Sequence, residues 1–218
     1  MPRIHSLTFY CVMLCCALTL VPASSSSAGE LALHPDAFND GIQSWTGSFS
    51  LNTTVDSVTL IADLDFAVFT AADFNANYGG LGYTPDGPLV YTYQLLNNGT
   101  QSITTEIVGL SNAVSSIGTF NIGDVDASTT ALGPDARWDF SPGVGSLEDS
   151  YGLVFSSPNL PMLGNSLTVS ASQQGFLSAF QFGVPTPGAV AIPEPASLFL
   201  LGLGGLVAMT QLTRKRRA

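Results

Sequence analysis

Apolar and polar residues alternate along much of the chain between residues 29 and 184. The clearest case is Val58–Val68, where every even position is apolar and the odd positions include Thr59, Asp63 and Asp65. A period of two predicts a β-strand with one buried face and one solvated face. A helix would instead scatter these acidic side chains around its axis.

A second alternating unit predicts a β-hairpin. Pro88–Leu96 and Ser102–Val108 are both rich in Thr, Tyr and β-branched residues, which favour strands. The dipeptide Asn98-Gly99 lies between them and can adopt the two positive φ angles of a type I′ turn. The sequence therefore favours direct antiparallel pairing of these two strands.

Further short strands, separated by Gly- and Pro-containing turns, complete the pattern, and one short helix is expected at Ala71–Asn77. The additional predicted strands are Ile42–Leu51, Ser115–Ile122, Arg137–Phe140, Gly152–Ser156, Leu167–Ser170 and Ser178–Phe182. Many short strands with such turns are typical of an all-β fold. We expect a single antiparallel β-sandwich, jelly-roll or immunoglobulin-like, over residues 29–184.

The N-terminus has the pattern of a secretory signal peptide over residues 1–28. Arg3 precedes an apolar run, Leu7–Val21, and small residues allow cleavage after Ala23 or Ala28. The alternative is an uncleaved membrane anchor, for which this run is short. We therefore expect the export translocon as a partner. All cysteines, Cys11, Cys15 and Cys16, lie in this segment, so the exported domain uses neither disulfides nor thiolates.

The C-terminus combines three features in a fixed order. A Pro/Gly-rich linker, residues 185–195, ends in Pro193-Glu194-Pro195, and an apolar segment at 196–212 follows. As a helix this segment is about 25 Å long, the lower limit for a transmembrane span. The tail at 213–218 contains Arg214, Lys215, Arg216 and Arg217. Such a basic tail stops translocation and stays in the cytoplasm, although an ordinary single-span anchor has similar parts.

This C-terminus resembles the PEP-CTERM sorting signal. The residues that carry the resemblance are Pro193-Glu194-Pro195, the short apolar segment with Gly202, Gly204 and Gly205, and the Arg-rich end. The resemblance covers residues 192–218. It implies a bacterial envelope protein, typically of Gram-negative species that make exopolysaccharide, which a membrane-embedded exosortase processes near the Pro-Glu-Pro motif. The function of the preceding domain does not follow from it.

Charge separates the expected domain from the two ends of the chain. Only 10% of the residues are charged, and 15 of the 16 acidic ones lie between residues 29 and 192, together with a single basic residue, Arg137. Nucleic-acid binding requires the opposite sign, because phosphate neutralisation supplies most of the affinity. The sequence therefore excludes a nucleic-acid-binding protein.

Few kinds of catalytic site can be built from the side chains of the expected domain. It contains His34, Arg137, no Cys and no Lys, and it lacks the metalloprotease, nucleophile-elbow and phosphate-loop motifs. We expect no catalytic residues. A carboxylate-dependent glycan hydrolase is the remaining enzymatic alternative, since it needs only two acids facing each other across a cleft.

Two kinds of binding residue are candidates. Asp63 with Asp65, and Asp124 with Asp126, place pairs of carboxylates where calcium could bind, although a solvated acidic face is the simpler interpretation. Apart from calcium, no cofactor is expected. Aromatic rings that can stack on a sugar are Trp45, Tyr78, Tyr83 and Trp138, and packing in the core is the alternative for them.

The sequence thus predicts an exported, non-enzymatic protein with a structural or adhesive role in an exopolysaccharide layer. A carbohydrate-binding module is the second interpretation, and exposed aromatic rings on a sheet or loop would distinguish it. The hydrolase is the third.

Overall fold

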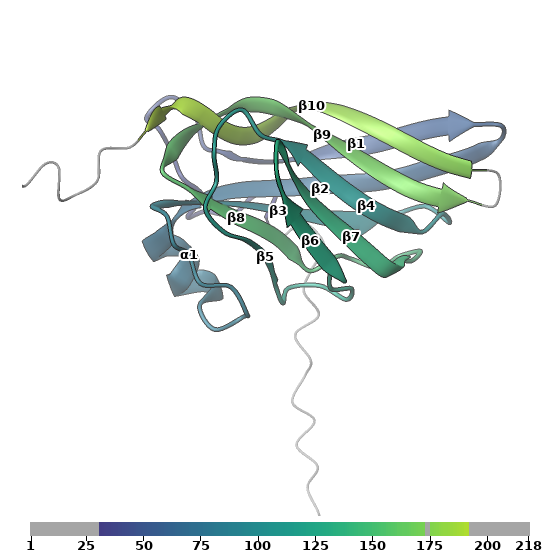
Figure 1. Ribbon diagram of the computed structural model, residues 1–218, viewed down its shortest axis with the longest axis horizontal. Coiled ribbons are helices and arrows are strands. Elements are labelled where there is room, and N and C mark those ends of the chain that lie inside the picture. Colours follow the sequence, from purple (N-terminus) through teal and green to yellow (C-terminus); the bar gives the residue numbers. More distant parts are fainter. Residues whose placement is uncertain (1–30, 173–174, 192–218) are drawn as a thin grey trace, which may run out of the picture.

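The computed structural model describes residues 31–172 and 175–191, which form two five-stranded antiparallel sheets and one short helix (Figure 1). In spatial order the first sheet contains β1 (Thr46–Val55), β2 (Val58–Thr70), β3 (Leu89–Asn97), β8 (Gly152–Ser157) and β5 (Ile117–Phe120). The second contains β10 (Gly175–Ala191), β9 (Asn159–Ser172), β4 (Ile103–Gly109), β7 (Asp135–Val144) and β6 (Thr129–Leu132). The predicted all-β fold is confirmed, and the choice between jelly-roll and immunoglobulin-like types stays a prediction.

The main core lies between the two sheets. The Trp138 ring of β7 is stacked on Phe155 of β8, with ring centroids 6.3 Å apart, and Tyr93 of β3 packs against both rings. These side chains are fully buried and belong to one apolar cluster with residues from both sheets. Burial of this apolar area is the main force that holds the sheets together.

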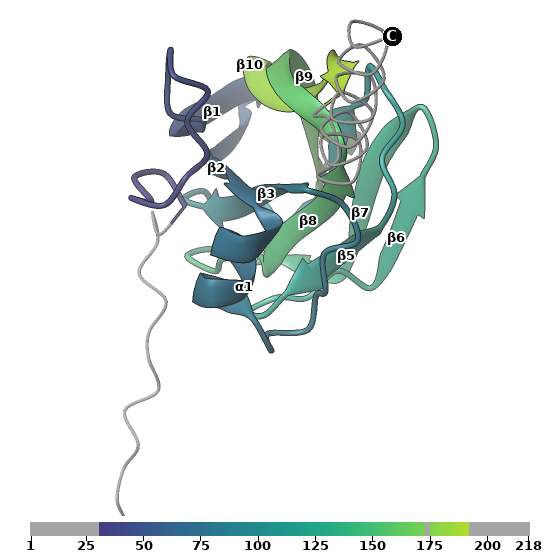
Figure 2. The same ribbon diagram turned by 90° about the vertical axis from the view of Figure 1, so that its left-hand side faces the viewer.

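The alternation in β2 is confirmed over its first half and fails over its second. The even positions from Leu60 to Val68 face the inter-sheet core as predicted. On the other face, however, Ala67 and Phe69 are also buried, because α1 (Ala71–Tyr78) covers them (Figure 2). Residues covered on both faces lose the solvated side that the alternation implied.

The helix α1 lies where the sequence predicted it and is capped at its start. The Thr70 hydroxyl accepts a hydrogen bond from the backbone N–H of Asp73 at 3.2 Å and donates one to the Asp73 carboxylate at 2.6 Å. This satisfies one of the free N–H groups at the helix start. Phe74 and Tyr78 form the buried side of α1 and pack against Phe69 of β2.

The predicted hairpin around Asn98-Gly99 is wrong. β3 belongs to the first sheet and β4 to the second, so the segment between them crosses from one sheet to the other. Its geometry is set by Asn97, which is 1% exposed and donates from its amide to the carbonyls of Gln101 at 2.7 Å and Val144 at 2.8 Å. Gly99 has no positive φ; it is required because a Cβ there would lie 3.1 Å from the backbone N and O of Ile61.

The tight hairpin is instead the one between β1 and β2. Val55 pairs with Val58, and the two residues between them, Asp56 and Ser57, have φ angles of 50° and 66°. Both lie in the left-handed region that a type I′ turn requires. This dipeptide carries no strong turn signal because neither residue is Gly or Asn.

The remaining predicted strands are present, with different ends. The predicted segments Leu167–Ser170 and Ser178–Phe182 are only parts of the long strands β9 and β10. β10 continues to Ala191, so the predicted boundary between domain and linker at 184/185 falls inside a strand whose residues 184–188 are buried. The prolines are tolerated because β10 is an edge strand of its sheet. β6 was not predicted.

We expect the double substitution Asp56→Asn with Ser57→Gly to stabilise the protein, by up to about 1 kcal/mol. Asn and Gly adopt positive φ at lower cost than Asp and Ser do. Urea denaturation followed by fluorescence of the buried tryptophans measures the change in the free energy of unfolding.

The control is Gly99→Ala, at the dipeptide that the sequence favoured as the turn. Its added Cβ contacts the Ile61 backbone, so this variant should be less stable than the wild type. If Gly99→Ala raises the free energy of unfolding, or if the double substitution lowers it, the turn assignment is wrong.

Candidate functional site

The outer face of the second sheet carries one row of neighbouring residues across all five strands. The register places these residues, from β10 to β6, in the order Phe180, Leu167, Ile107, Arg137 and Ala131. The row is apolar except for Arg137, the one basic residue of the described chain. The sheet therefore presents an apolar stripe to solvent with a single charged pair at one side.

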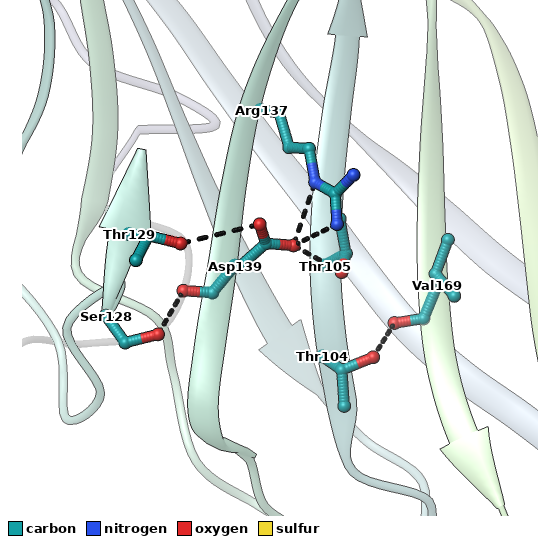
Figure 3. Close-up of polar contacts among 7 residues, drawn as sticks. All are labelled: Thr104, Thr105, Ser128, Thr129, Arg137, Asp139 and Val169. Carbon is teal, nitrogen blue, oxygen red and sulfur yellow. Dashed lines mark hydrogen bonds and ion pairs between the residues drawn. The ribbon is translucent and has the colours of Figure 1, made fainter. Parts of the chain in front are cut away.

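That charged pair is Arg137 with Asp139, two positions along β7 (Figure 3). The Arg137 guanidinium donates from Nε at 2.9 Å and from Nη2 at 2.8 Å to Oδ1 of Asp139, which also accepts from the Thr105 hydroxyl at 2.8 Å. Partial burial raises the pKa of Asp139, but these hydrogen bonds outweigh it and lower the pKa below its ordinary value. Arg137 is therefore paired with an acid of its own strand. Because the pair is exposed, its net contribution is small, about 0–1 kcal/mol.

A groove of about 250 Å³ lies beside this pair, between β4, β6 and β7. Its lining residues are Ile107, Ala131, Leu132, Gly133, Pro134, Asp135 and Arg137. This volume is below the roughly 300–1,000 Å³ of most small-molecule sites. Asp135 is the only carboxylate in the lining, so the groove does not contain the two facing acids that a glycan hydrolase uses.

The four rings predicted to stack on sugars are all buried. Exposed fractions are 6% for Trp45, 2% for Tyr78, 8% for Tyr83 and 0% for Trp138. The indole N–H of Trp45 donates to Asp40 at 2.9 Å, and that of Trp138 donates to the Gly118 carbonyl at 2.9 Å. These rings are core residues, because a large ring with one polar atom is easily buried once that atom finds a partner.

The exposed aromatic residues are phenylalanines that the sequence did not single out. Phe176, Phe180 and Phe182 of β10 are 81%, 52% and 71% exposed. Leu177 and Ala179, on the opposite face of the same strand, are buried in the core. Because apolar residues occupy both faces here, the pattern alone does not show which side is buried.

Most of the acids predicted as possible calcium ligands accept hydrogen bonds from protein groups. Asp63 accepts hydrogen bonds from Ser50 and Asn98, both at 2.7 Å, and Asp126 accepts one from Thr119 at 2.6 Å. Asp124 accepts one from the backbone N–H of Asp149. Asp65 is 2% exposed, and its burial raises its pKa.

These acids do not gather into a cation site. Among the residues that the structure describes, no group of three or more His, Cys, Asp or Glu side chains is arranged to hold a metal ion. Calcium binding stays a prediction.

Glu106 of β4 is the titratable group most changed by the fold. It is fully buried between the sheets, and its Oε2 accepts a hydrogen bond from the Thr168 hydroxyl at 2.5 Å. Burial raises the pKa of Glu106 to about 8, and the hydroxyls of Thr168 and Ser166 offset this only in part. The side chain is therefore an uncharged acid at neutral pH, enclosed in the core rather than facing a cleft.

Comparison with known protein families identifies the C-terminus. Residues 191–217 match the family model of the PEP-CTERM protein-sorting motif, so the resemblance drawn from Pro193-Glu194-Pro195 is confirmed. The motif implies processing by an exosortase-type membrane enzyme and an exported protein in bacteria. Comparisons with curated proteins and with solved structures found no match.

Several predicted segments lie outside the described residues. They are the signal peptide at 1–28, the motif at 193–195, the apolar segment at 196–212 and the basic residues Arg214, Lys215, Arg216 and Arg217. Within residues 31–172 and 175–191, no helix has the length and apolarity that a membrane span needs.

We expect Glu106 to make the protein less stable as the pH rises from about 4.5 to about 8. In this range the folded protein keeps a proton on Glu106 that the unfolded chain releases, so the free energy of unfolding falls by roughly 1.4 kcal/mol per pKa unit of difference. Glu106→Gln removes this dependence. The variant should therefore be more stable than the wild type at pH 8 and similar to it at pH 5, as measured by urea denaturation at both values.

Asp139→Asn is the matched control, because the pKa of Asp139 is lowered in the folded state. Its stabilising contribution is fully present above its ordinary pKa of 3.8 and is lost only on acidification below that value, so Asp139→Asn should be less stable than the wild type by the same amount at pH 5 and at pH 8. Equal pH profiles for the wild type and Glu106→Gln would show that Glu106 is not held in its neutral form.

Proposed function

We propose that this chain is a non-enzymatic protein of the bacterial cell envelope, exported and then released or transferred to the cell surface by an exosortase-type enzyme. The match of residues 191–217 to the sorting motif carries this proposal. The preceding sandwich is the exported cargo, with a structural or adhesive role in an exopolysaccharide layer. Before processing, the segment at 196–212 holds the domain at the outer side of the inner membrane.

The placement of the chemical groups supports a non-enzymatic role. His34 packs edge-on against Phe69, with ring centroids 4.9 Å apart, and its Nδ1 accepts the backbone N–H of Asp36. Arg137 is paired with Asp139 on an open sheet face, and Glu106 is enclosed in the core. Each of these side chains is thus held by a contact within the domain, and Glu106 is fully enclosed.

Carbohydrate binding is the alternative function. Its binding residues would have to differ from the four aromatic residues predicted from the sequence. Trp45, Tyr78, Tyr83 and Trp138 are unavailable because they are buried. Within the described chain, the exposed aromatic surface is that of Phe176, Phe180 and Phe182.

The sorting proposal is tested by replacing Pro193, Glu194 and Pro195 with alanine. The two prolines keep the backbone extended and present Glu194 for recognition, so their loss should stop processing. In cells with an exosortase-type enzyme, the variant should stay at its unprocessed size in the membrane fraction, whereas the wild type appears at the cell surface or in the medium. Immunoblots of fractionated cells measure both size and location.

Glu148→Ala, a change of an exposed glutamate outside the motif, should leave processing unchanged. In cells that lack the enzyme, the wild type should behave like the triple variant. Normal release of the triple variant, or normal processing of the wild type without the enzyme, would overturn the proposal.

A further inference from the structure

An exposed ridge of aromatic side chains lies on the edge strand β10. This ridge, which we call the Phe ridge, consists of Phe176, Phe180 and Phe182 on the outer face of the second sheet. The rings of Phe180 and Phe182 are in contact, with centroids 4.7 Å apart. Exposing three phenylalanines of one strand to water is unfavourable in free energy and unusual for a folded domain. Such a patch therefore marks an interaction surface.

The Phe ridge lies in the part of the domain that carries no charge. No acidic or basic residue occurs from Ser150 to Ala191, a stretch that includes all of β8, β9 and β10. The acidic residues of the domain lie before Ser150. At the edge of the second sheet, the strands β10 and β9 therefore carry no charged side chain, whereas β8 lies within the other sheet.

The chain places this edge next to the apolar C-terminal segment. β10 ends at Ala191, and only residues 192–195 separate it from the apolar segment that starts at 196. The five Cα–Cα steps from Ala191 to residue 196 span at most about 18 Å. Whatever membrane holds residues 196–212 therefore lies within that distance of the end of β10.

We propose that, while the chain is anchored, the Phe ridge contacts the outer surface of the bilayer that holds residues 196–212. This inference rests on the membrane anchoring in the proposed function. β9 and β10 run along the longest axis of the molecule, so the domain would lie along the membrane rather than stand on it (Figure 1). Phenylalanine is among the side chains that insert at the boundary between headgroups and acyl chains.

The energetics favour this contact for a tethered domain. Each phenylalanine that leaves water contributes a favourable free energy in proportion to the apolar area that it buries. Because the anchor makes the contact intramolecular, the effective concentration of the surface is in the millimolar range, and a modest affinity suffices. Anionic lipids repel the acidic elements, which orients the uncharged edge toward the bilayer.

Two other occupants fit the surface less well. A second copy of the chain would bring together two domains with 15 acidic side chains and one basic side chain each. A pyranose ring stacks on a flat platform, whereas Phe180 and Phe182 meet at 76°. The bilayer needs neither a flat platform nor an opposite charge.

The test places a nitroxide probe at Ser178→Cys, an exposed position between Phe176 and Phe180. The matched control is Ala76→Cys on α1, which covers the outer face of the other sheet. Both are made in the mature chain, residues 29–218, which lacks the signal peptide and its three cysteines, and are reconstituted in vesicles of phosphatidylethanolamine and phosphatidylglycerol. Vesicle flotation reports anchoring, and collision with a water-soluble nickel chelate and with oxygen reports the depth of each probe.

We expect the probe at 178 to lose most of its exposure to the nickel chelate and to gain exposure to oxygen, while the probe at 76 stays in water. Adding Phe176→Ser, Phe180→Ser and Phe182→Ser should return the probe at 178 to water without changing flotation. If the chain floats and the probe at 178 is as exposed as the probe at 76, the inference is wrong and the anchoring stands. If the chain does not float, the anchoring itself is wrong. Shielding that depends on protein concentration, or that needs added polysaccharide, assigns the ridge to a second copy or to a glycan and also overturns the inference.

Discussion

The packing of two sheets around Trp138, Tyr93 and Phe155 has to hold this domain together with very little electrostatic help. Between residues 29 and 192 there are 15 acidic side chains and one basic one, and no cysteine. Neither ion pairs nor disulfides can therefore contribute much, and stability depends on buried apolar area and on the backbone ladders. Carboxylates are instead stabilised by hydroxyl and amide donors, as at Asp63 and Asp139, or kept neutral by burial, as at Glu106.

The features that the sequence predicted well are those whose sequence signals are local. Val58–Val68 and Ala71–Asn77 were predicted correctly because their signals are local, an alternation and a capped turn. The Asn98-Gly99 hairpin failed because a local turn signal cannot show that the chain crosses to the other sheet, a step that depends on buried Asn97 contacting Gln101 and Val144. Likewise, α1 covers β2 through contacts between segments, which no period within β2 reveals.

For the candidate surface, the sequence predicted exposed aromatic rings at four residues that the structure buries. Tryptophan and tyrosine were the natural candidates for an exposed platform, but the structure gives each indole a hydrogen-bond partner and buries it. Phenylalanine has no polar atom and is commonly buried, so nothing in the sequence singled it out as a surface residue. Its exposure at Phe176, Phe180 and Phe182 follows from the pleat of β10, in which Leu177 and Ala179 already fill the inward positions. Only the three-dimensional register distinguishes these two faces.

The junction between the folded domain and the sorting motif links structure to processing. β10 ends at Ala191, and the match to the sorting motif begins at the same residue, so no long linker separates the two. Cleavage near Pro193-Glu194-Pro195 would leave every described strand intact, because the last paired residue of β10 is Ala191. An enzyme that acts there must approach within a few residues of a folded edge strand. The strand that such an enzyme would approach, β10, and its neighbour β9 carry no charged side chain.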